Sequence, residues 1–312
     1  MPHGIPSHDT FGRVFAALDP AAVEQRFLGW VQTALAPAAE QVIAVDGKTV
    51  RRSHERGAGQ GPLHLISAWA TDTGVALGQI RVADHANEIT ALPELLDQVV
   101  MAGAVITLDA MGCQREVART ITERDGDYVL ALKGNQPALH AAVALLFAGG
   151  GDGAPPATTV DQAETIDAGH GRIDRRSCWA TDDPVVRGYL DPDGRWPGLR
   201  SVAMVATERT TSTGASRETR SYLSSLPADA ARLNRIVRTH WRIENELHWV
   251  LDVVFDEDQS RVRRGYADQN LALVRRIALS LLKQDRTTKV GIKAKRLRAA
   301  CDDDYLRSLL GQ

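Results

Sequence analysis

Two short apolar segments, each followed by an aspartate, constrain the fold of this chain more than any other feature. The first is Val42 to Val45, which leads into Asp46 and Gly47, and the second is Val105 to Leu108, which leads into Asp109. Apolar runs of this length that end in turn residues are typical of buried strands. They are too short to cross a membrane, and no run of 18 or more apolar residues occurs among the 312 residues. We therefore expect two core strands that each end at an acid, in a protein without a membrane span.

Further periodic segments surround these two runs. Leu63 to Ala70 and Val75 to Val82 flank turn residues, which predicts a β-hairpin. The other expected elements are helices at Glu88–Met101, Gln114–Arg124 and Pro137–Phe147 and a strand at Tyr128–Leu132. The resulting order of strand, hairpin, helix, strand, helix, strand, helix matches the ribonuclease H-like fold. We therefore expect an α/β protein with a mixed sheet flanked by helices.

The chain is expected to divide into four regions. Residues 1–40 are predicted to be a helical segment, because Asp19 can cap a helix that begins at Pro20. Residues 41–148 form the first part of the core, and a Gly- and Pro-rich stretch follows it. Residues 149–227 are expected to be a β-rich insertion, because short alternating segments occur at Arg172–Trp179, Ser201–Thr207 and Arg217–Leu223. Residues 228–312 return to helical periodicity and end in a basic helical tail.

Charge is distributed unevenly along the chain, although its net charge is only -2. Residues 259–312 hold 13 Lys and Arg against five Asp. Such a segment is either a phosphate-binding surface or a solvated helical surface, and charge alone favours neither. The three cysteines are scattered and the N-terminus has no apolar signal segment, so a reduced, cytoplasmic setting is expected.

Asp46 and Asp109 are the first candidates for chemistry. Functional groups of open α/β sheets gather at the carboxyl ends of strands, so the two carboxylates would converge if their strands are neighbours. Two close carboxylates repel each other unless a cation lies between them, and Mg²⁺ prefers such oxygen ligands. The alternative is that each aspartate only begins a turn or caps a helix.

A third acid is expected from the helical segment His240 to Asp252. Its residues Ile243, Leu247, Val250 and Val254 make an apolar stripe, and Glu244 lies at the edge of that stripe. His240, Glu244 and His248 share one helix face, so a transition-metal site and plain surface hydrogen bonding are rival interpretations. Glu246 points away from the stripe and is expected to be solvated.

Several motifs along the chain resemble those of the H-repeat-associated, ISAs-type insertion-sequence transposases, a branch of the DDE transposases. The matching stretches are Ile43–Thr49, Asn87–Ala91, Thr107–Gln114, Asp127–Gln136, Gly169–Arg172, His240–Asn245 and Glu257–Asp258. The resemblance implies that Asp46, Asp109 and Glu244 are the catalytic acids and hold Mg²⁺ or Mn²⁺, with two ions expected. It also implies double-stranded DNA as the partner, in the form of terminal inverted repeats and target DNA. By analogy the protein would act as a homodimer on that DNA, and it would be nucleoid-associated when bound.

Contacts to DNA are expected from polar residues within or beside these motifs. The expected contacts are Lys48, Lys133, Asn135, Gln136, His170, Arg172, His240 and Arg242. Capping by Asn135 and a solvated hairpin tip at His170 and Arg172 are the alternatives. Trp241 and Trp249 are expected to pack rather than to stack on bases.

The sequence also departs from the pattern of the broader group. Val237, His240 and Leu251 stand where that group has Tyr, Arg and Lys. A protonated His240 could still contact a phosphate, and Arg238 or Arg242 could supply a fixed charge instead. The region before the first catalytic strand is shorter than in relatives, which suggests a truncated end-recognition region.

The predicted function is metal-dependent strand cleavage and transfer by a DDE transposase. The alternatives are a truncated, catalytically silent DNA-binding relic and a metal-dependent DNA nuclease without strand transfer. Salt-sensitive DNA binding without cleavage would distinguish the first alternative, and cut ends that never integrate would distinguish the second.

Overall fold

A computed structural model of the chain describes residues 4–34, 40–54, 61–83, 87–148, 159–169 and 171–311. The chain forms two compact units. Unit 1 comprises Met1–Ala38, Asp46–Val99 and Arg242–Gln312, and unit 2 comprises Ala39–Val45 and Val100–Trp241. In the part of the chain that is described, no helix is both long and apolar enough to cross a bilayer.

The strands follow the order β3-β2-β1-β4-β5-β9-β8-β7-β6, in which neighbours are hydrogen-bonded. Their bounds are β1 Val42–Thr49, β2 His64–Ala70, β3 Val75–Arg81, β4 Val105–Leu108, β5 Asp127–Leu132, β6 Asp161–Gly169, β7 Arg172–Thr181, β8 Ser201–Thr211 and β9 Gly214–Ser224. The β2–β3, β5–β9 and later pairs are antiparallel, whereas β1–β4 and β4–β5 are parallel. The expected mixed sheet and the expected β2–β3 hairpin are therefore confirmed.

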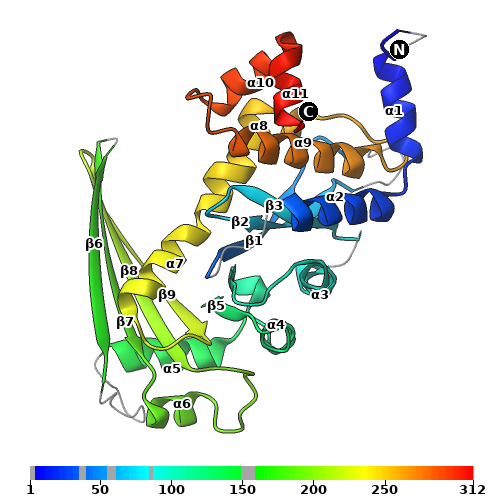
Figure 1. Cartoon of the computed structure of the whole chain (residues 1–312). Coiled ribbons are helices and arrows are strands. Elements are labelled where there is room, and N and C mark those ends of the chain that lie inside the picture. The colour runs from blue at the N-terminus through cyan, green and yellow to red at the C-terminus, as the bar shows by residue number, and fades with distance from the viewer. Residues whose placement is uncertain are drawn as a thin grey trace. The chain divides into compact units, whose positions relative to one another are not determined.

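Unit 1 is built from β2, β3, the end of β1 and most of the helices. These helices are α1 His8–Ala17, α2 Pro20–Ala34, α3 Glu88–Gln98, α8 Trp249–Val254, α9 Ala267–Gln284, α10 Ile292–Cys301 and α11 Asp303–Leu309. The predicted start of α2 is confirmed, because Asp19 accepts a hydrogen bond from the backbone N–H of Ala22 at 3.3 Å. Helices α2, α3 and α9 pack against β3 (Figure 1). Ser67 and Trp69 of β2 both contact α9 side chains, so that face of β2 is the one that α9 covers.

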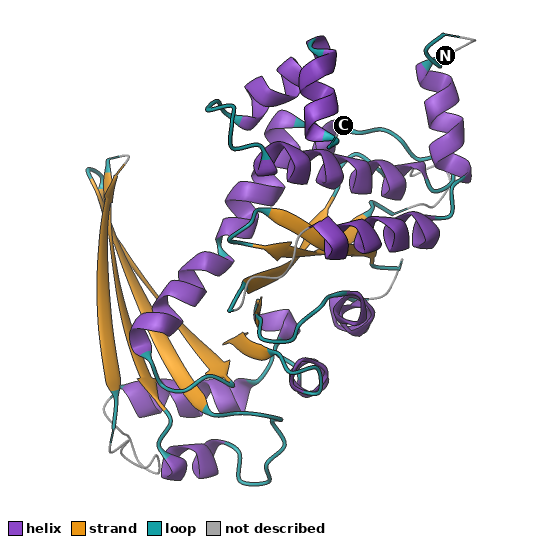
Figure 2. Ribbon diagram, in the orientation of Figure 1, coloured by secondary structure: helices purple, strands orange, loops and turns teal. Residues whose placement is uncertain are grey.

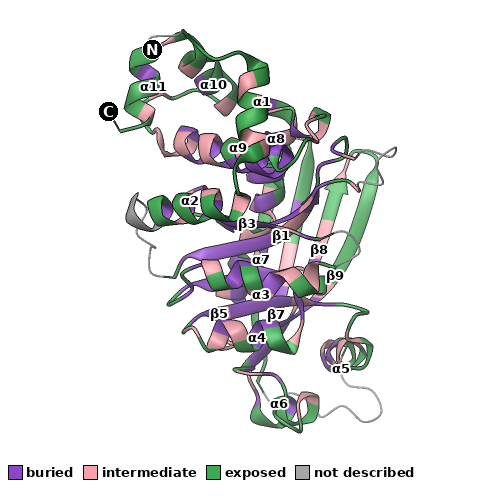
Figure 3. Ribbon diagram, turned by 90° about the vertical axis from the view of Figure 1, so that its right-hand side faces the viewer, coloured by how far each residue is buried: buried purple, intermediate pink, exposed green. Residues whose placement is uncertain are grey.

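Unit 2 contains the parallel pair β4–β5 and the antiparallel strands β6 to β9 (Figure 2). Its helices are α4 Arg115–Thr122, α5 Pro137–Phe147, α6 Pro184–Leu190 and α7 Ala230–His240. Leu233 and Ile236 of α7 pack on Cys178 of β7 and Val205 of β8 in one apolar core. The paired ends of β8 and β9 beyond this core are exposed, whereas the ends that adjoin β5 are buried (Figure 3).

The structure also corrects three details of the sequence-based expectations. β1 continues to Thr49, so Asp46 lies within the strand and does not end it, whereas β4 does end directly before Asp109. Strand β6 and helix α6 were not expected from the sequence. β6 is mostly exposed and has few apolar residues, which removes the usual signal of a strand.

Candidate active site

Asp46 points to the face of β1 that is covered by a helical segment of unit 1. Its Oδ2 lies 3.2 Å from Nε2 of His248, and the Asp46 side chain keeps 22% of its surface exposed. Among the described residues, neither buried ring nitrogen of His248 has a hydrogen-bond partner of good geometry, so the contact is a close approach rather than a directed bond. The partly exposed Asp46 carboxylate is therefore accessible from solvent and has one buried imidazole beside it.

Lys48, two residues further along β1, is held by carboxylates on the same face. Its Nζ lies 2.6 Å from Asp252, 3.2 Å from Asp258 and 3.7 Å from Glu257. The Lys48 side chain is only 8% exposed. The structure thus places this expected DNA contact inside unit 1, bound to three carboxylates.

Glu244 begins a π-helical turn, η3, that spans Glu244–His248 and leads directly into α8. The backbone N–H of Trp249 bonds to the carbonyl of Glu244, which is the i to i−5 bond of a π-helix. Glu244 is exposed, and the apolar stripe expected beside it is confirmed as buried: Ile243, Leu247, Val250 and Val254. π-turns of this kind occur often at functional sites, so the turn is a further reason to consider Glu244 a candidate site residue.

Glu246 is not solvated as expected. Its carboxylate accepts hydrogen bonds from Arg242 Nε at 2.6 Å and from Lys283 Nζ at 2.7 Å. Arg242 lies one helical turn before Glu246, whereas Lys283 comes from α9, which is distant in the sequence. Burial raises the pKa of Glu246, but the hydrogen bonds from Arg242 and Lys283 outweigh it and hold the pKa below its ordinary value.

Glu246→Gln should destabilise the protein by about 1 to 2 kcal/mol at neutral pH, because two charge-assisted hydrogen bonds are weakened. A carboxyl with a lowered folded-state pKa contributes stability above its unfolded-state pKa and loses it as the pH falls through the folded-state value. The difference between wild type and the variant should therefore shrink as the pH falls below the ordinary carboxyl value of about 4.5. Urea unfolding between pH 3 and pH 7 measures this, and a difference that stays constant with pH would contradict it.

The opposite face of β1 carries a hydrogen-bonded chain that sequence reasoning missed. His64 Nδ1 lies 2.8 Å from the Thr49 hydroxyl, and its Nε2 lies 2.7 Å from the Glu88 carboxylate. A Cβ on Gly47 would meet that carboxylate at 2.2 Å, so a larger residue at position 47 would have to displace the Glu88 side chain. Glu88 lies in the matching stretch Asn87–Ala91, which was the available sequence signal. These hydrogen bonds connect β1, β2 and the start of α3.

Asp109 belongs to unit 2 and follows β4 directly. It caps the short helix η2, Ala110–Gly112, by accepting a hydrogen bond from the N–H of Met111 at 3.0 Å. Asn135 donates to the carbonyls of Ala110 and Cys113, and Gln136 donates to the carbonyl of Cys113 at 3.2 Å. These two expected DNA contacts therefore brace the turn that carries Asp109. Asn135 is not the cap of α5, because Gln136 holds that position without a side-chain capping bond.

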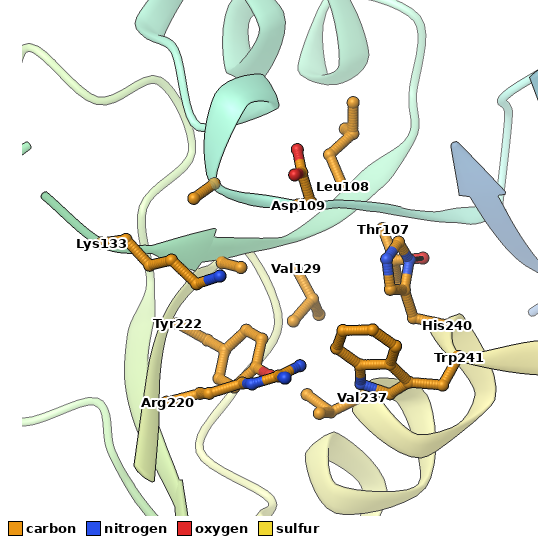
Figure 4. A pocket seen from close by; sticks show the side chains of 12 residues that line it. Thr107, Leu108, Asp109, Val129, Lys133, Arg220, Tyr222, Val237, His240 and Trp241 are labelled. Carbon is orange, nitrogen blue, oxygen red and sulfur yellow. Dashed lines mark hydrogen bonds between the residues drawn. The ribbon is translucent and has the colours of Figure 1, made fainter. Parts of the chain in front are cut away.

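A pocket within unit 2 extends from Asp109 to the end of α7. Figure 4 shows Lys133, directly after β5, and Arg220 of β9 extending into it, while the Asp109 carboxylate points away from the Trp241 ring. The Arg220 guanidinium lies 4.1 Å from the centre of that ring. Lys133 is exposed, so the pocket presents positive charge next to the acid.

The remaining expected DNA contacts have different surroundings. His240 lines the pocket, with Nδ1 at 2.8 Å from the hydroxyl of Thr107. Arg172 lies 3.4 Å from Asp174, which Arg176 and Arg209 also contact. The hydrogen bond from Arg209 is the main cause that holds the pKa of Asp174 below its ordinary value. His170 lies outside the described residues.

Two other expectations are corrected. The basic tail is not simply a charged surface, because Arg276 and Lys295 are buried and Lys283 is paired with Glu246. Its exposed cations lie mainly in and before α10: Arg286, Lys289, Lys293, Arg296 and Arg298. Trp249 does not pack into the core, since 58% of it is exposed.

A transition-metal site on the His240, Glu244 and His248 face finds no support. His240 contacts Thr107 and His248 contacts Asp46. Within the described ranges, no three or more His, Cys, Asp or Glu side chains are grouped so that they could hold a metal ion.

Comparison with known proteins assigns the family. The family model described as "Transposase DDE domain" matches residues 37–281. The Escherichia coli (strain K12) protein named "H repeat-associated putative transposase YhhI" is 36% identical over 99% of this chain and 81% of its own length. The "Putative transposase YncI" of Escherichia coli O157:H7 is 36% identical over 99% of this chain and 78% of its own length. A Xanthobacter autotrophicus protein from the dhlA 3′ region is 44% identical over 73% of this chain and 75% of its own length.

Among solved structures, the "Cryo-EM structure of piggyBac transposase synaptic complex with hairpin DNA" aligns with a TM-score of 0.41 at 10% identity. The alignment covers 88% of this chain and 55% of that one, so this chain spans about half its length. The family assignment rests on the sequence matches. Because the family model matches most of the chain and relatives above 30% identity extend over 99% of it, the chain belongs to the DDE transposases, together with the H repeat-associated members of that family.

Proposed function

We propose that this protein cleaves DNA at the terminal inverted repeats of an insertion sequence and joins the freed ends to target DNA. The observation that carries the proposal is the register of β1 on β4. The parallel pairing ends at Val45 and Leu108, and the residue that follows each of them is an acid, Asp46 or Asp109. We propose that these two carboxylates work together with Glu244, on a ribonuclease H-like core with a β-rich insertion.

The proposed cofactor is Mg²⁺ or Mn²⁺, and the chemistry of the three proposed donors supports it. All three side chains offer carboxylate oxygens, the ligands that hard divalent cations prefer. Asp46 and Asp109 are partly exposed and Glu244 is exposed, so solvent ions have access to each of them. Bound in pairs, such ions lower the pKa of an attacking water or 3′-hydroxyl and stabilise the leaving oxygen of a phosphodiester.

The residues around Asp109 are suited to bind DNA close to the scissile phosphate. Exposed Lys133 supplies a mobile cation, and Arg220, stacked on Trp241, supplies a fixed one. Arg172, His240 and Arg242 remain proposed phosphate contacts, and a homodimer on paired ends remains a proposed assembly. Asn135 and Gln136 support the site by holding the turn after Asp109.

Purified full-length protein should nick duplexes that carry the inverted repeats of its insertion sequence, and it should join the 3′ ends to a plasmid. Both reactions should require Mg²⁺ or Mn²⁺ and should stop in EDTA. A gel assay with labelled ends measures cleavage and joining separately. Salt-sensitive binding without cleavage would indicate the silent DNA-binding relic, and cleavage without joining would indicate the nuclease; either result would overturn the proposal.

A further inference from the structure

The segment that carries Glu244 is attached to the strand that carries Asp46 by two contacts at matched spacing. On the strand side the partners are Asp46 and Lys48, and on the helix side they are His248 and Asp252. Two residues along a strand advance about 6.6 Å, and four residues along an α-helix advance about 6 Å. Because the two rises nearly agree, both contacts form in a single register, and a slip of one residue would break both.

The two contacts differ in strength. His248 approaches Asp46 without a well-directed hydrogen bond, whereas Lys48 donates to Asp252 at 2.6 Å while almost fully buried. Asp252 is 31% exposed, so the bond is partly buried, and a partly buried, charge-assisted bond holds its partners more firmly than a fully exposed ion pair. The Lys48–Asp252 contact is therefore the firmer of the two links between β1 and α8.

The carboxylates around Lys48 have further cationic partners. Glu257 accepts a hydrogen bond from the fully buried Arg276 at 3.0 Å. Asp258 accepts hydrogen bonds from Nζ of Lys48 and from the backbone N–H of Arg51, each at 3.2 Å, and Nε of Arg51 lies 3.2 Å from its other oxygen. The removal of Lys48 would take away the cation that Asp252 and Asp258 share.

We propose that Lys48 is a positioning residue that fixes the register of the Glu244-bearing π-turn relative to Asp46, and so preorganises the divalent-ion site, instead of contacting DNA. This inference rests on the proposed function. It explains why a lysine two residues beyond a metal-ligating aspartate is buried among acids. Residues that orient metal ligands change metal affinity by about 10- to 100-fold when they are replaced.

The test measures Mn²⁺ affinity, by electron paramagnetic resonance of the free ion, for full-length protein on an inverted-repeat duplex. Lys48→Met should raise the Kd for Mn²⁺ at least about 10-fold, and Lys48→Arg should recover most of the affinity. The affinity for DNA in Ca²⁺ should stay within about 2-fold of wild type, because Lys48 does not face the DNA. Asp252→Asn removes the same contact from the helix side and should raise the Kd similarly, so it serves if Lys48→Met does not fold.

Lys295→Met is the matched control. Lys295 is also a buried lysine of unit 1, but it bonds to the carbonyls of Leu282 and Asp285 and joins α9 to α10. Its replacement should lower the melting temperature and leave the Kd for Mn²⁺ unchanged. An unchanged Kd in Lys48→Met or Asp252→Asn, or an equal rise in Lys295→Met, would overturn the inference while the proposed function stands. Absence of Mn²⁺ binding and cleavage in the wild type would overturn both.

Discussion

Asp46→Asn is expected to reduce DNA cleavage by roughly 10³-fold or more while the protein stays folded. The change keeps the size of the side chain and removes its charge, so the approach of His248 at 3.2 Å remains sterically possible. A neutral amide binds a divalent cation much more weakly than a carboxylate, and the nucleophile is then no longer activated. Asp109→Asn should have an effect of the same order, because the two acids follow register partners on adjacent strands.

The measurement is single-turnover cleavage of an inverted-repeat duplex, with circular dichroism to confirm folding. Asp304→Asn is the control, because Asp304 is 93% exposed and lies in the C-terminal helix. It should cleave at the wild-type rate. If Asp46→Asn retained more than a tenth of the wild-type rate, Asp46 would not be a metal ligand in this reaction.

Arg276→Met should destabilise unit 1 by about 3 to 5 kcal/mol. Arg276 is fully buried and donates to Glu257 at 3.0 Å, to the carbonyl of Ala272 at 3.1 Å and to Ser67 at 3.3 Å. Without it, the equally buried Glu257 would keep, among the described residues, only Lys48 at 3.7 Å and Arg275 at 3.9 Å as nearby cations. An undercompensated buried charge is costly, whereas the loss of both partners costs much less.

Urea-induced unfolding measures this effect. The double variant Arg276→Met/Glu257→Met should recover most of the lost stability, because no buried charge is left without its partner. Arg286→Met is the control, since Arg286 is exposed, and it should change stability by less than about 0.5 kcal/mol. Equal losses in the single and double variants would show that the stability comes from packing of the Arg276 side chain and not from charge pairing.

The regular elements around the acids follow from local patterns. The apolar runs before Asp46 and Asp109 form β1 and β4, and Pro20 begins α2 with Asp19 as its cap. These features can be predicted because their signals are local: an apolar run favours a buried strand, and an Asp before a Pro favours a helix start. The same patterns did not reveal β6, whose few apolar residues give almost no strand signal.

The surroundings of the third acid were harder to predict. The apolar stripe from Ile243 to Val254 does not distinguish a π-turn from an α-helix. Glu246 was wrongly expected to be solvated, because the sequence gives no local signal for its bond to Lys283. The burial of Lys48 depends on Asp252 and Asp258, which lie more than 200 residues away in the sequence. Contacts at that separation form only when the whole unit folds, and a single sequence carries no local signal for them.

Joint metal binding by Asp46, Asp109 and Glu244 is the central feature of the proposed function. The most direct test counts Mn²⁺ ions per chain, by electron paramagnetic resonance, for wild type, Asp46→Asn, Asp109→Asn and Glu244→Gln on inverted-repeat DNA. Wild type is expected to bind about two ions, and each variant at least one fewer. Equal Mn²⁺ occupancy in wild type and all three variants would contradict joint binding.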